Sequence, residues 1–533
     1  MMRARRHYIW ALMAGLISAA LFTLPPLAGY RSAARDNKVF LGFIRSDDYH
    51  RYGSFMEQAR REHRFLFLDH SALGPQDPRI LAIVFWGLGR AAALLGQSSA
   101  TMWLLFRFTA SPLLFLSLVY FMQRAFPDDP IMATRVLWLA TVSTGLDYLL
   151  APLLVIPRLK NFWMDGFSTF HLHHNPLKVL AMALLLLFLA QVLDTHRRGV
   201  TIARTITSCF LFAALWAVHP NTAIVAYCSF GLLPLALLVT PAAQRHSRSD
   251  YLRFFLPHAV PALVIGSFIL WMRRDPVVAH IISCYQVSAR EPFINYPIRY
   301  GLLILPAAAA LVHWARRRST AGLLVAGWLL VGVITSNLRI LTGLLFQHTI
   351  HLPLVIAAAA GIPLVLPRRR IRTAVLVICG LYFAAIQSFS LVQICRQTVG
   401  DVWPTSLYAS RDEMAALEYL GRCAPGNVLV NRNLGNKVGF VSLQNSFLGH
   451  WGTTPERGRK EREFARFIDP LTTLQWKERL LDRYGIRYIL YSRTEMLVAE
   501  PDPRLPTKRI FSSGQTEIFE VDRQASNSAG AAE

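Results

Sequence analysis

The sequence predicts an all-α polytopic membrane protein with a small C-terminal α/β domain. Of its 533 residues, 53% are hydrophobic and only 17% are charged, whereas a soluble chain carries about 25% charged residues. Long apolar runs alternate with clusters of Lys and Arg, so the net charge of +24 is explained by the signal that orients membrane spans. No nucleic-acid partner is expected from this charge, and membrane lipid is the expected surrounding.

The first apolar run, residues 8–28, predicts an uncleaved membrane span. It is long enough to cross a bilayer, and Arg3, Arg5 and Arg6 precede it, as in a signal anchor. Pro25 and Pro26 fit a signal-peptide cleavage site poorly, so we expect the segment to stay in the mature protein.

Further apolar runs predict the remaining spans of the membrane domain, which covers residues 1–395. Together with the first they give about eleven transmembrane helices. The predicted spans are residues 99–123, 131–153, 176–193, 202–218, 221–240, 252–271, 298–315, 320–336, 351–366 and 374–394.

The basic clusters predict the orientation of these spans. They fall in every second connection, on the side of the N-terminus, which places the N-terminus in the cytoplasm and the C-terminus outside. We therefore expect a multi-pass membrane protein whose C-terminal part lies outside the cytoplasm. The clusters are Arg124 with Arg135; His196, Arg197, Arg198 and Arg204; Arg245, Arg248 and Arg253; Arg316, Arg317 and Arg318; and Arg368, Arg369, Arg370 and Arg372.

The first outer connection, residues 30–98, contains a further apolar segment at residues 80–96. This segment is short and is interrupted by Gly87, Gly89 and Arg90. It therefore predicts an interfacial amphipathic helix instead of a span.

The chain after residue 395 becomes charged and loses its long apolar runs. It predicts an extracytoplasmic α/β domain over residues 396–523 and a disordered tail over residues 524–533. Cys395 and Cys423 would both face the outside, which suggests a disulfide between them. The expected helices are residues 411–423, 455–467 and 474–484, and the expected strands are residues 427–430, 487–491, 509–511 and 516–521.

Candidate catalytic residues are the acids and histidines of the outer connections. Asp47 and Asp48 are adjacent, and Arg45, His50 and Arg51 flank them. Most acids beside a membrane are simply solvated, but a pair in this basic and aromatic setting suggests chemistry. The second outer connection, residues 154–175, supplies Asp165, His171, His173 and His174.

These motifs resemble the GT-C class of integral membrane glycosyltransferases, and within it a bacterial mannosyltransferase-like branch. Members carry an acidic motif in the first outer loop, an amphipathic helix before the second span and often an exported C-terminal domain. The matching segments are residues 46–49 (SDDY), 80–96, 169–177 (TFHLHHNPL), 448–456 (LGHWGTTPE) and 483–490 (RYGIRYIL).

The resemblance implies transfer of a sugar from a polyprenyl-phosphate donor to a glycan, lipid or protein acceptor, with inversion. Asp47 or Asp48 would act as the general base on the acceptor hydroxyl, and the sequence does not choose between them. Asp165 matches a second acid, which in some members works with a divalent metal such as Mg²⁺ or Mn²⁺. His171, His173 and His174 would be nitrogen ligands or packed interfacial side chains, and the metal requirement stays open.

The leaving phosphate requires positive charge at the outer ends of the spans. Arg339, Arg45 and His348 are the expected donor phosphate-binding residues. His219, in a short outer turn before Pro220, is a further candidate for the cavity, or else belongs simply to the turn.

Two other functions stay open at this point. A transporter or flippase of a lipid-linked or anionic solute usually places ionisable residues at the bilayer midplane, whereas here they gather at the outer face. A non-catalytic protein of envelope assembly would keep the acidic motif without using it.

Overall fold

A computed structural model gives the fold of the chain. It describes residues 2–42, 46–73, 76, 78, 80–143, 173, 175–238, 248–276, 279–280, 283, 300–337, 347–402, 406–450, 452–493 and 502–522. The chain forms two compact units. The first contains Met1–Thr23, Leu104–Leu270 and Tyr285–Gln393, and the second contains Leu24–Trp103, Trp271–Cys284 and Ile394–Glu533.

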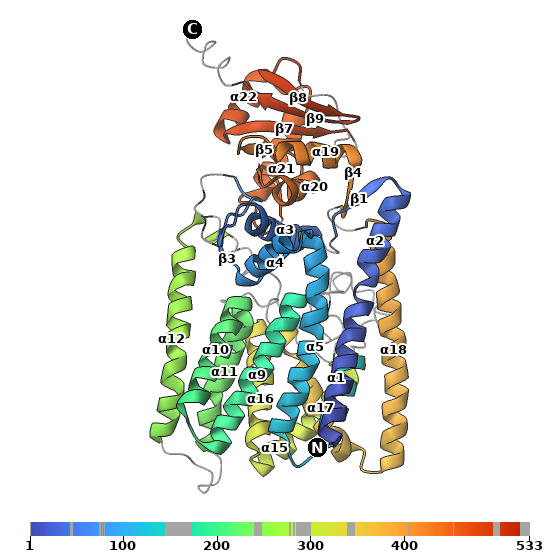
Figure 1. Ribbon diagram of the computed structural model, residues 1–533, viewed down its shortest axis with the longest axis vertical. Coiled ribbons are helices and arrows are strands. Elements are labelled where there is room, and N and C mark those ends of the chain that lie inside the picture. The colour runs from blue at the N-terminus through green and yellow to red at the C-terminus, as the bar shows by residue number, and fades with distance from the viewer. Residues whose placement is uncertain are drawn as a thin grey trace. The chain divides into compact units, whose positions relative to one another are not determined.

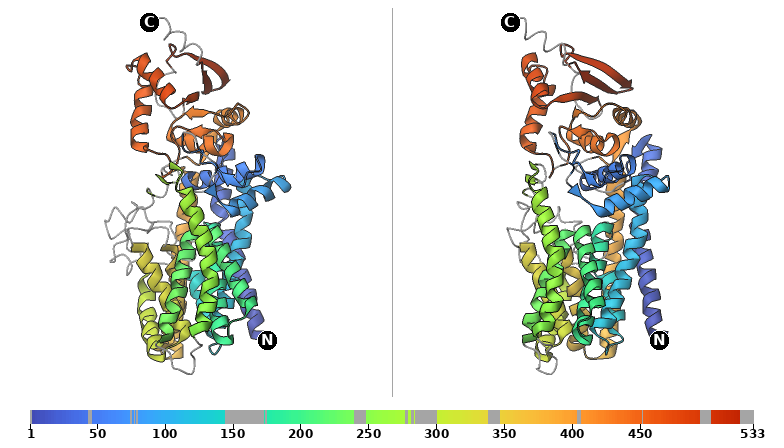
Figure 2. Two further views of the ribbon diagram at one scale, coloured as in Figure 1. Left: turned by 90° about the vertical axis from the view of Figure 1, so that its left-hand side faces the viewer. Right: turned by 60° about the vertical axis from the view of Figure 1, so that its left-hand side comes forward.

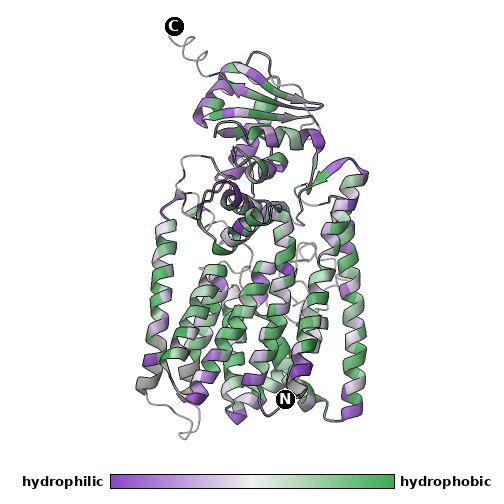
Figure 3. Cartoon of the chain, viewed as in Figure 1, coloured by the Kyte–Doolittle hydropathy of each residue, from purple (hydrophilic) through white to green (hydrophobic). Residues whose placement is uncertain are grey.

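The first unit is a helical bundle. Its apolar residues cover most of each helix (Figure 3), as expected where helices are surrounded by lipid or by one another. Its helices are α1 (Met2–Leu21), most of α5 (Ser99–Ala125), α6 (Met132–Val142), α9 (Pro176–Arg198), α10 (Ile202–Val218), α11 (Pro220–Leu238), most of α12 (Arg248–Met272), η3 (Gly301–Leu303), α15 (Ile304–Arg317), α16 (Thr320–Asn337), α17 (His351–Val365) and most of α18 (Arg369–Val399).

Close helix contacts build the core of this bundle. Helix α9 packs against α10, α11 against α16, and α15 against α17, and α9, α10 and α11 run side by side in Figures 1 and 2. Phe188 and Trp328 are fully buried in the resulting apolar cluster. A side chain at Gly361 would collide with the Pro306 carbonyl, so α15 and α17 approach closely only because this residue has none.

Each predicted span coincides with a helix, although the second half of the span predicted at 131–153 lies outside the described residues. Six helical segments of the described residues are long and apolar enough to cross a membrane, judged by length and composition. The first runs over Arg5–Arg35 and is longer than expected, because α2 (Leu24–Arg35) continues from α1 after a turn at Phe22 and Thr23.

The second unit joins the first loop to the C-terminal part of the chain. Besides α2, its first-loop elements are β1 (Lys38–Phe40), α3 (Ser46–Arg61), β2 (Leu66–Phe67), β3 (Ile80–Leu81) and α4 (Ile83–Leu94). Its later elements are β4 (Tyr408–Ser410), α19 (Arg411–Leu420), β5 (Asn427–Leu429), α20 (Arg432–Lys437), the π-helix η5 (Val438–Ser442), β6 (Asn445–Ser446), α21 (Arg457–Ile468), α22 (Leu474–Arg483), β7 (Ile486–Ser492), β8 (Thr507–Ser513) and β9 (Thr516–Val521).

A five-stranded mixed sheet organises the C-terminal part. The strand order is β6-β5-β7-β9-β8, with β6, β5 and β7 parallel and the last two pairs antiparallel (Figure 1). The helices and strands expected after residue 410 lie within a few residues of these positions. Helix α19 begins with a capping box, in which the Ser410 hydroxyl and the Glu413 carboxylate each bond the backbone N–H of the other residue.

Backbone pairing and helix packing connect the first loop to this part. Strand β1 pairs antiparallel with β4, from Lys38 opposite Ser410 to Phe40 opposite Tyr408, and α3 packs against α4, α20 and η5. Helix α4 covers most of the amphipathic helix predicted at residues 80–96, but Ile80 and Leu81 form a strand. Cys395 and Cys423 are both free thiols, so the prediction of a disulfide between them is wrong.

Two glycines of α4 provide a test of this packing. A Cβ at Gly89 would collide with the Met56 carbonyl and with Ala59 of α3, whereas a Cβ at Gly87 meets nothing within 4 Å. Gly89→Ala should therefore destabilise the protein by about 1–3 kcal/mol through overpacking. Gly87→Ala is the matched control and should be neutral or stabilising by up to about 1 kcal/mol. Thermal unfolding of the purified variants measures both, and equal melting temperatures would contradict the packing of α4 on α3.

Candidate active site

The candidate catalytic acids lie at the start of α3. Asp47 and Asp48 both fall in the first turn of this helix, where the helix dipole and the unpaired backbone N–H groups favour negative charge. The side chain of Asp47, like Arg45 as a whole, lies outside the described residues. The side chain of Asp48 is 38% exposed.

Asp48 is bonded to a histidine that lies about 400 residues later in the chain. Nε2 of His450 is 2.9 Å from Oδ1 of Asp48, and the histidine side chain is fully buried. The backbone N–H of Gly452 donates to Nδ1 of the same ring over 3.1 Å. Because Nδ1 accepts a hydrogen bond, the proton of the neutral ring sits on Nε2 and is donated to Asp48.

A tight turn holds His450 in this position. The backbone N–H groups of Thr453 and Thr454 both donate to the His450 carbonyl, over 3.2 and 3.0 Å. The Thr454 hydroxyl accepts the Gly449 N–H and donates to the Ser71 carbonyl. Since Gly449 lies against Ser446 and Ser71 with no room for a Cβ, this turn depends on a glycine at that position.

Residues 69–72 and residues 445–454 form the seam between the two parts of this unit. The Ser446 backbone N–H and hydroxyl both donate to the His70 carbonyl, over 2.9 and 3.1 Å. Nδ1 of His70 is 3.0 Å from Oδ1 of Asn445. The first loop is thereby fixed to the edge of the sheet at β6.

The same stretch is fixed to α3 by a buried ion pair. Arg51 lies three residues after Asp48, and its Nε donates to Oδ2 of Asp69 over 2.8 Å. Asp69 is 1% exposed and also accepts the Ser71 N–H. Asp69 is therefore a structural anchor. Glu57 has a similar role, since it is buried and accepts from Arg60, Arg61 and Ser99.

His50 is buried behind the acidic pair. Its ring stacks on Phe440 at 5.8 Å between centroids, with 11° between the planes. Burial lowers the pKa of His50 to about 3, and the positive charge of Lys437 acts in the same direction. Burial also lowers the pKa of His70, against the opposing effect of its bond to Asn445. Both rings are therefore neutral near pH 7.

In the first unit, a hydrogen-bonded chain joins two of the predicted histidines. The Thr222 hydroxyl is 2.9 Å from Nδ1 of His219 and 2.8 Å from Nε2 of His348. The Thr222 backbone N–H also donates to Nδ1 of His219 over 3.3 Å. Nδ1 of His219 is thus an acceptor, so His348 donates to Thr222 and Thr222 donates to His219.

Among the described residues, this series of hydrogen bonds ends at Nε2 of His219, which carries the ring proton. His348 and Thr222 are buried, whereas His219 is half-buried. The ammonium of Lys178, near the start of α9, lies close enough to act electrostatically on His219. An imidazole N–H donor at this position suits an anionic ligand.

Of the predicted residues in the second outer connection, the structure describes His173. His173 is buried, bonds Ser111 through Nδ1 over 2.8 Å and stacks on Phe115 at 5.5 Å. Asp165, His171, His174 and Arg339 lie outside the described residues. Among the residues that the structure does describe, no three His, Cys, Asp or Glu side chains are placed to hold a metal ion.

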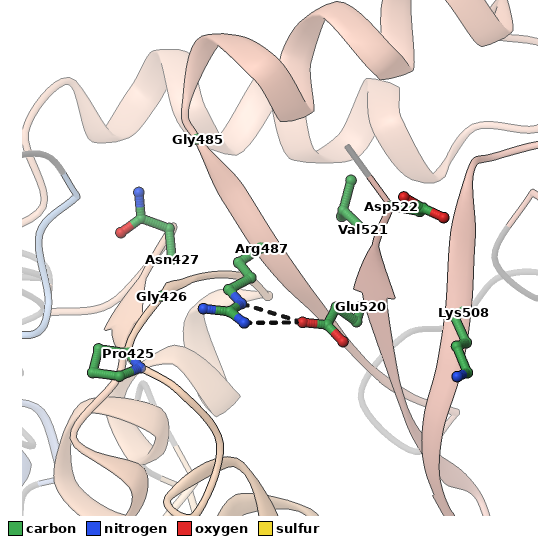
Figure 4. A pocket seen from close by; sticks show the side chains of 9 residues that line it. All are labelled: Pro425, Gly426, Asn427, Gly485, Arg487, Lys508, Glu520, Val521 and Asp522. Atoms are coloured by element: carbon green, nitrogen blue, oxygen red, sulfur yellow. Dashed lines mark hydrogen bonds and ion pairs between the residues drawn. The ribbon is translucent and has the colours of Figure 1, made fainter. Parts of the chain in front are cut away.

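A pocket also opens on the C-terminal sheet, away from the residues predicted from the sequence. It lies at the amino ends of β5 and β7, and the ion pair between Arg487 and Glu520, 3.2 Å long, forms part of its wall (Figure 4). None of the predicted site residues lines it.

Comparison with known proteins identifies the fold. No protein-family model matches the sequence, and no curated protein matches it. An oligosaccharyltransferase of Archaeoglobus fulgidus, solved with a tethered acceptor peptide, superposes with a TM-score of 0.50 at 11% identity, over 90% of this chain and 70% of that one. ArnT from Cupriavidus metallidurans, solved bound to undecaprenyl phosphate, gives 0.50 at 14% identity, over 94% and 97% of the two chains.

A third solved structure, the arabinofuranosyltransferase AftD from Mycobacteria, gives a TM-score of 0.51 at 13% identity, over 95% of this chain and 41% of that one. All three are GT-C membrane glycosyltransferases. The chain therefore has the GT-C fold, as its motifs predicted.

Three residues of the two polar groups were not assigned by sequence reasoning. His450 lies in the segment 448–456 that carries part of the resemblance, but nothing in the sequence connects it to Asp48. Thr222 is three residues after His219, a spacing that places both on one side of a helix start. Lys178 is a single charge at the start of an apolar span, and a charge in this position is a sequence signal for a functional residue.

The buried histidines predict the pH dependence of stability. His50 is neutral when folded and binds a proton when unfolded below its ordinary pKa of 6.5. Its contribution is therefore complete above pH 6.5 and is lost as the pH falls towards 3, at up to about 1.4 kcal/mol per pH unit. The melting temperature should fall between pH 7 and pH 5. His50→Phe should reduce that fall, whereas replacing the exposed His313 by Phe should not. Identical pH profiles for His50→Phe and the wild type would contradict this account.

Proposed function

We propose that this protein is a bacterial inner-membrane glycosyltransferase that moves a sugar from a polyprenyl-phosphate donor to an acceptor outside the cytoplasm. The observation that carries the proposal is the placement of Asp48, a part-exposed carboxylate at a helix start, oriented by a buried histidine, in a chain with the GT-C fold. Two of the similar structures add support, since one was solved bound to undecaprenyl phosphate and another with a tethered acceptor peptide.

Asp48 is the residue that we assign as general base. Its carboxylate would take the proton of the acceptor hydroxyl while the acceptor oxygen attacks the anomeric carbon. The bond from that carbon to the phosphate oxygen breaks, and polyprenyl phosphate leaves with the bonding electrons. Attack opposite the leaving phosphate gives inversion. Asp47, in the same turn, would add negative charge beside the oxocarbenium-like carbon.

We assign the donor phosphate to positive and N–H groups at the outer ends of the spans. His219 and Lys178 support this role, because one presents an N–H and the other a positive charge. In this proposal His348 acts through Thr222 to fix the His219 ring, and Arg339 and Arg45 remain the arginines expected to pair with phosphate. Asp165, with a divalent ion, would supply the second acid where the reaction requires a metal.

Substitution of the acids tests the proposed base. Asp48→Asn should lower transfer from a panel of radiolabelled polyprenyl-phosphate sugars, with polyprenyl-phosphate mannose first, by about 10²–10⁴-fold, because the amide cannot accept the proton. Asp36→Asn removes an exposed acid of the same loop and should leave the rate unchanged. Normal transfer by Asp48→Asn would exclude this base. A different outcome would favour a transporter. In that case the wild type would transfer no sugar but would move lipid-linked sugar across vesicle membranes, and Asp48→Asn would lose this movement.

The histidine chain gives a separate test of donor binding. His219→Ala and Thr222→Val should each raise the KM for the polyprenyl-phosphate sugar, by about tenfold, because each removes or misorients one hydrogen bond to a charged group. Thr335→Val is the matched control, since Thr335 is also buried and its hydroxyl donates to the Val331 and Gly332 carbonyls of its own helix. A KM unchanged in both variants would contradict the assignment.

A further inference from the structure

We infer that His450 is a positioning residue for the reaction, so that the C-terminal part of the chain supplies an essential piece of the active site. This inference rests on the proposed function of Asp48. It assigns to residues 448–450 and 452–454 a specific task, which is to orient the Asp48 carboxylate through the Nε2–H of His450.

The hydrogen bonds of His450 define what the ring can do. Nδ1 accepts the Gly452 N–H over 3.1 Å, so the ring has one proton, on Nε2, and that proton points at Oδ1 of Asp48 over 2.9 Å. A ring with its second nitrogen occupied by an amide cannot pass a proton onward. His450 therefore orients the carboxylate and takes no proton from it.

Burial of the His450 ring restricts its orientation and therefore that of the Asp48 carboxylate. The His450 side chain is fully buried, while that of Asp48 remains 38% exposed and open to an acceptor. Thr454 bonds both the Gly449 N–H and the Ser71 carbonyl, so the turn that bears His450 is fixed to the first loop beside α3. A base held in this way loses less orientational freedom when the acceptor arrives.

The same contacts give the C-terminal part of the chain a role at Asp48. Asp48 is fixed from two sides: Arg51, one turn further along α3, pairs with Asp69, and His450 bonds the carboxylate itself. Residues 69–72 lie between these two fixed points and bond residues 445–454. The carboxylate orientation thus requires the C-terminal part to be folded and docked on the first loop.

Three substitutions at one position separate positioning from packing. His450→Phe keeps the ring volume but has no N–H, whereas His450→Gln places an amide N–H near the position of Nε2. His450→Ala removes both. Thr453→Val is the control, because Thr453 is equally buried in the same turn and its hydroxyl has no hydrogen-bond partner in the described part of the chain.

The full-length protein in lipid nanodiscs would be assayed with the donor panel, beginning with polyprenyl-phosphate mannose. We expect His450→Phe and His450→Ala to lower kcat by about 10²-fold, with the KM for the donor unchanged. His450→Gln should recover most of that loss, and Thr453→Val should match the wild type. If His450→Phe is as active as the wild type, or more active than His450→Gln, the ring serves packing alone and the inference is overturned.

Asp48→Asn in the same assay distinguishes this failure from failure of the proposed function. An inactive Asp48→Asn beside a fully active His450→Phe overturns only the role of His450. A fully active Asp48→Asn overturns the base and the positioning role together.

Melting temperatures of Asp48→Ala, His450→Ala and the double variant test the contact without any substrate. The two shifts should add to more than the shift of the double variant, because the second substitution finds the bond already broken. If the shifts in melting temperature of the two single variants simply add up to that of the double variant, the contact itself is overturned. This test is valid even if the enzyme accepts none of the donors in the panel.

Discussion

The seam between residues 69–72 and residues 445–454 is the constraint on which the second unit depends. Its hydrogen bonds join a short stretch of the first loop to the edge of the C-terminal sheet, and Arg51 of α3 pairs with Asp69 in the same stretch. The buried carbonyls of His70 and Ser71 accept hydrogen bonds from Ser446 and Thr454. Leaving such groups without partners costs about 1–3 kcal/mol each. Pairing the two segments avoids this cost and therefore stabilises their folding together.

This joint folding explains how a carboxylate can be both part-exposed and well oriented. An exposed side chain on a helix start normally samples several rotamers. Here the rest of α3 is buried against α4, α20 and η5, and His50 lies stacked on Phe440 behind the first turn. The polar part of Asp48 faces a fully buried imidazole with a fixed tautomer. Buried groups therefore support a carboxylate that remains part-exposed.

In the first unit, polar side chains are placed among apolar helices. Every buried polar group must find a partner where water is scarce. Thr222 connects His219 to His348, Ser111 bonds His173, and Arg124 pairs with Asp194 over 2.7 Å. Such networks specify one arrangement of the helices, because a shift by one residue would break them. Near the start of α11, the network also leaves one imidazole N–H at its end.

Composition and hydrophobic runs were sufficient to predict the long apolar helices. Apolar runs of span length have few alternatives to helix, since a backbone in lipid must bond within its own segment. The strands and helices after residue 410 were also placed closely, because local period and turn residues specify them. The first helix extended beyond its apolar run because Pro25 and Pro26 fit the first turn of α2, where a missing N–H costs nothing.

By itself, therefore, the sequence determined a mostly helical membrane protein and the positions of its long apolar helices. Only the tertiary structure decided that His450 bonds Asp48, that Thr222 links His219 with His348, and that the first loop folds with the C-terminal part. The physical reason is the sequence separation over which each interaction acts. Hydrophobic period and capping act over a few residues, whereas a hydrogen bond between side chains about 400 positions apart has no local signature and exists only after the chain has packed.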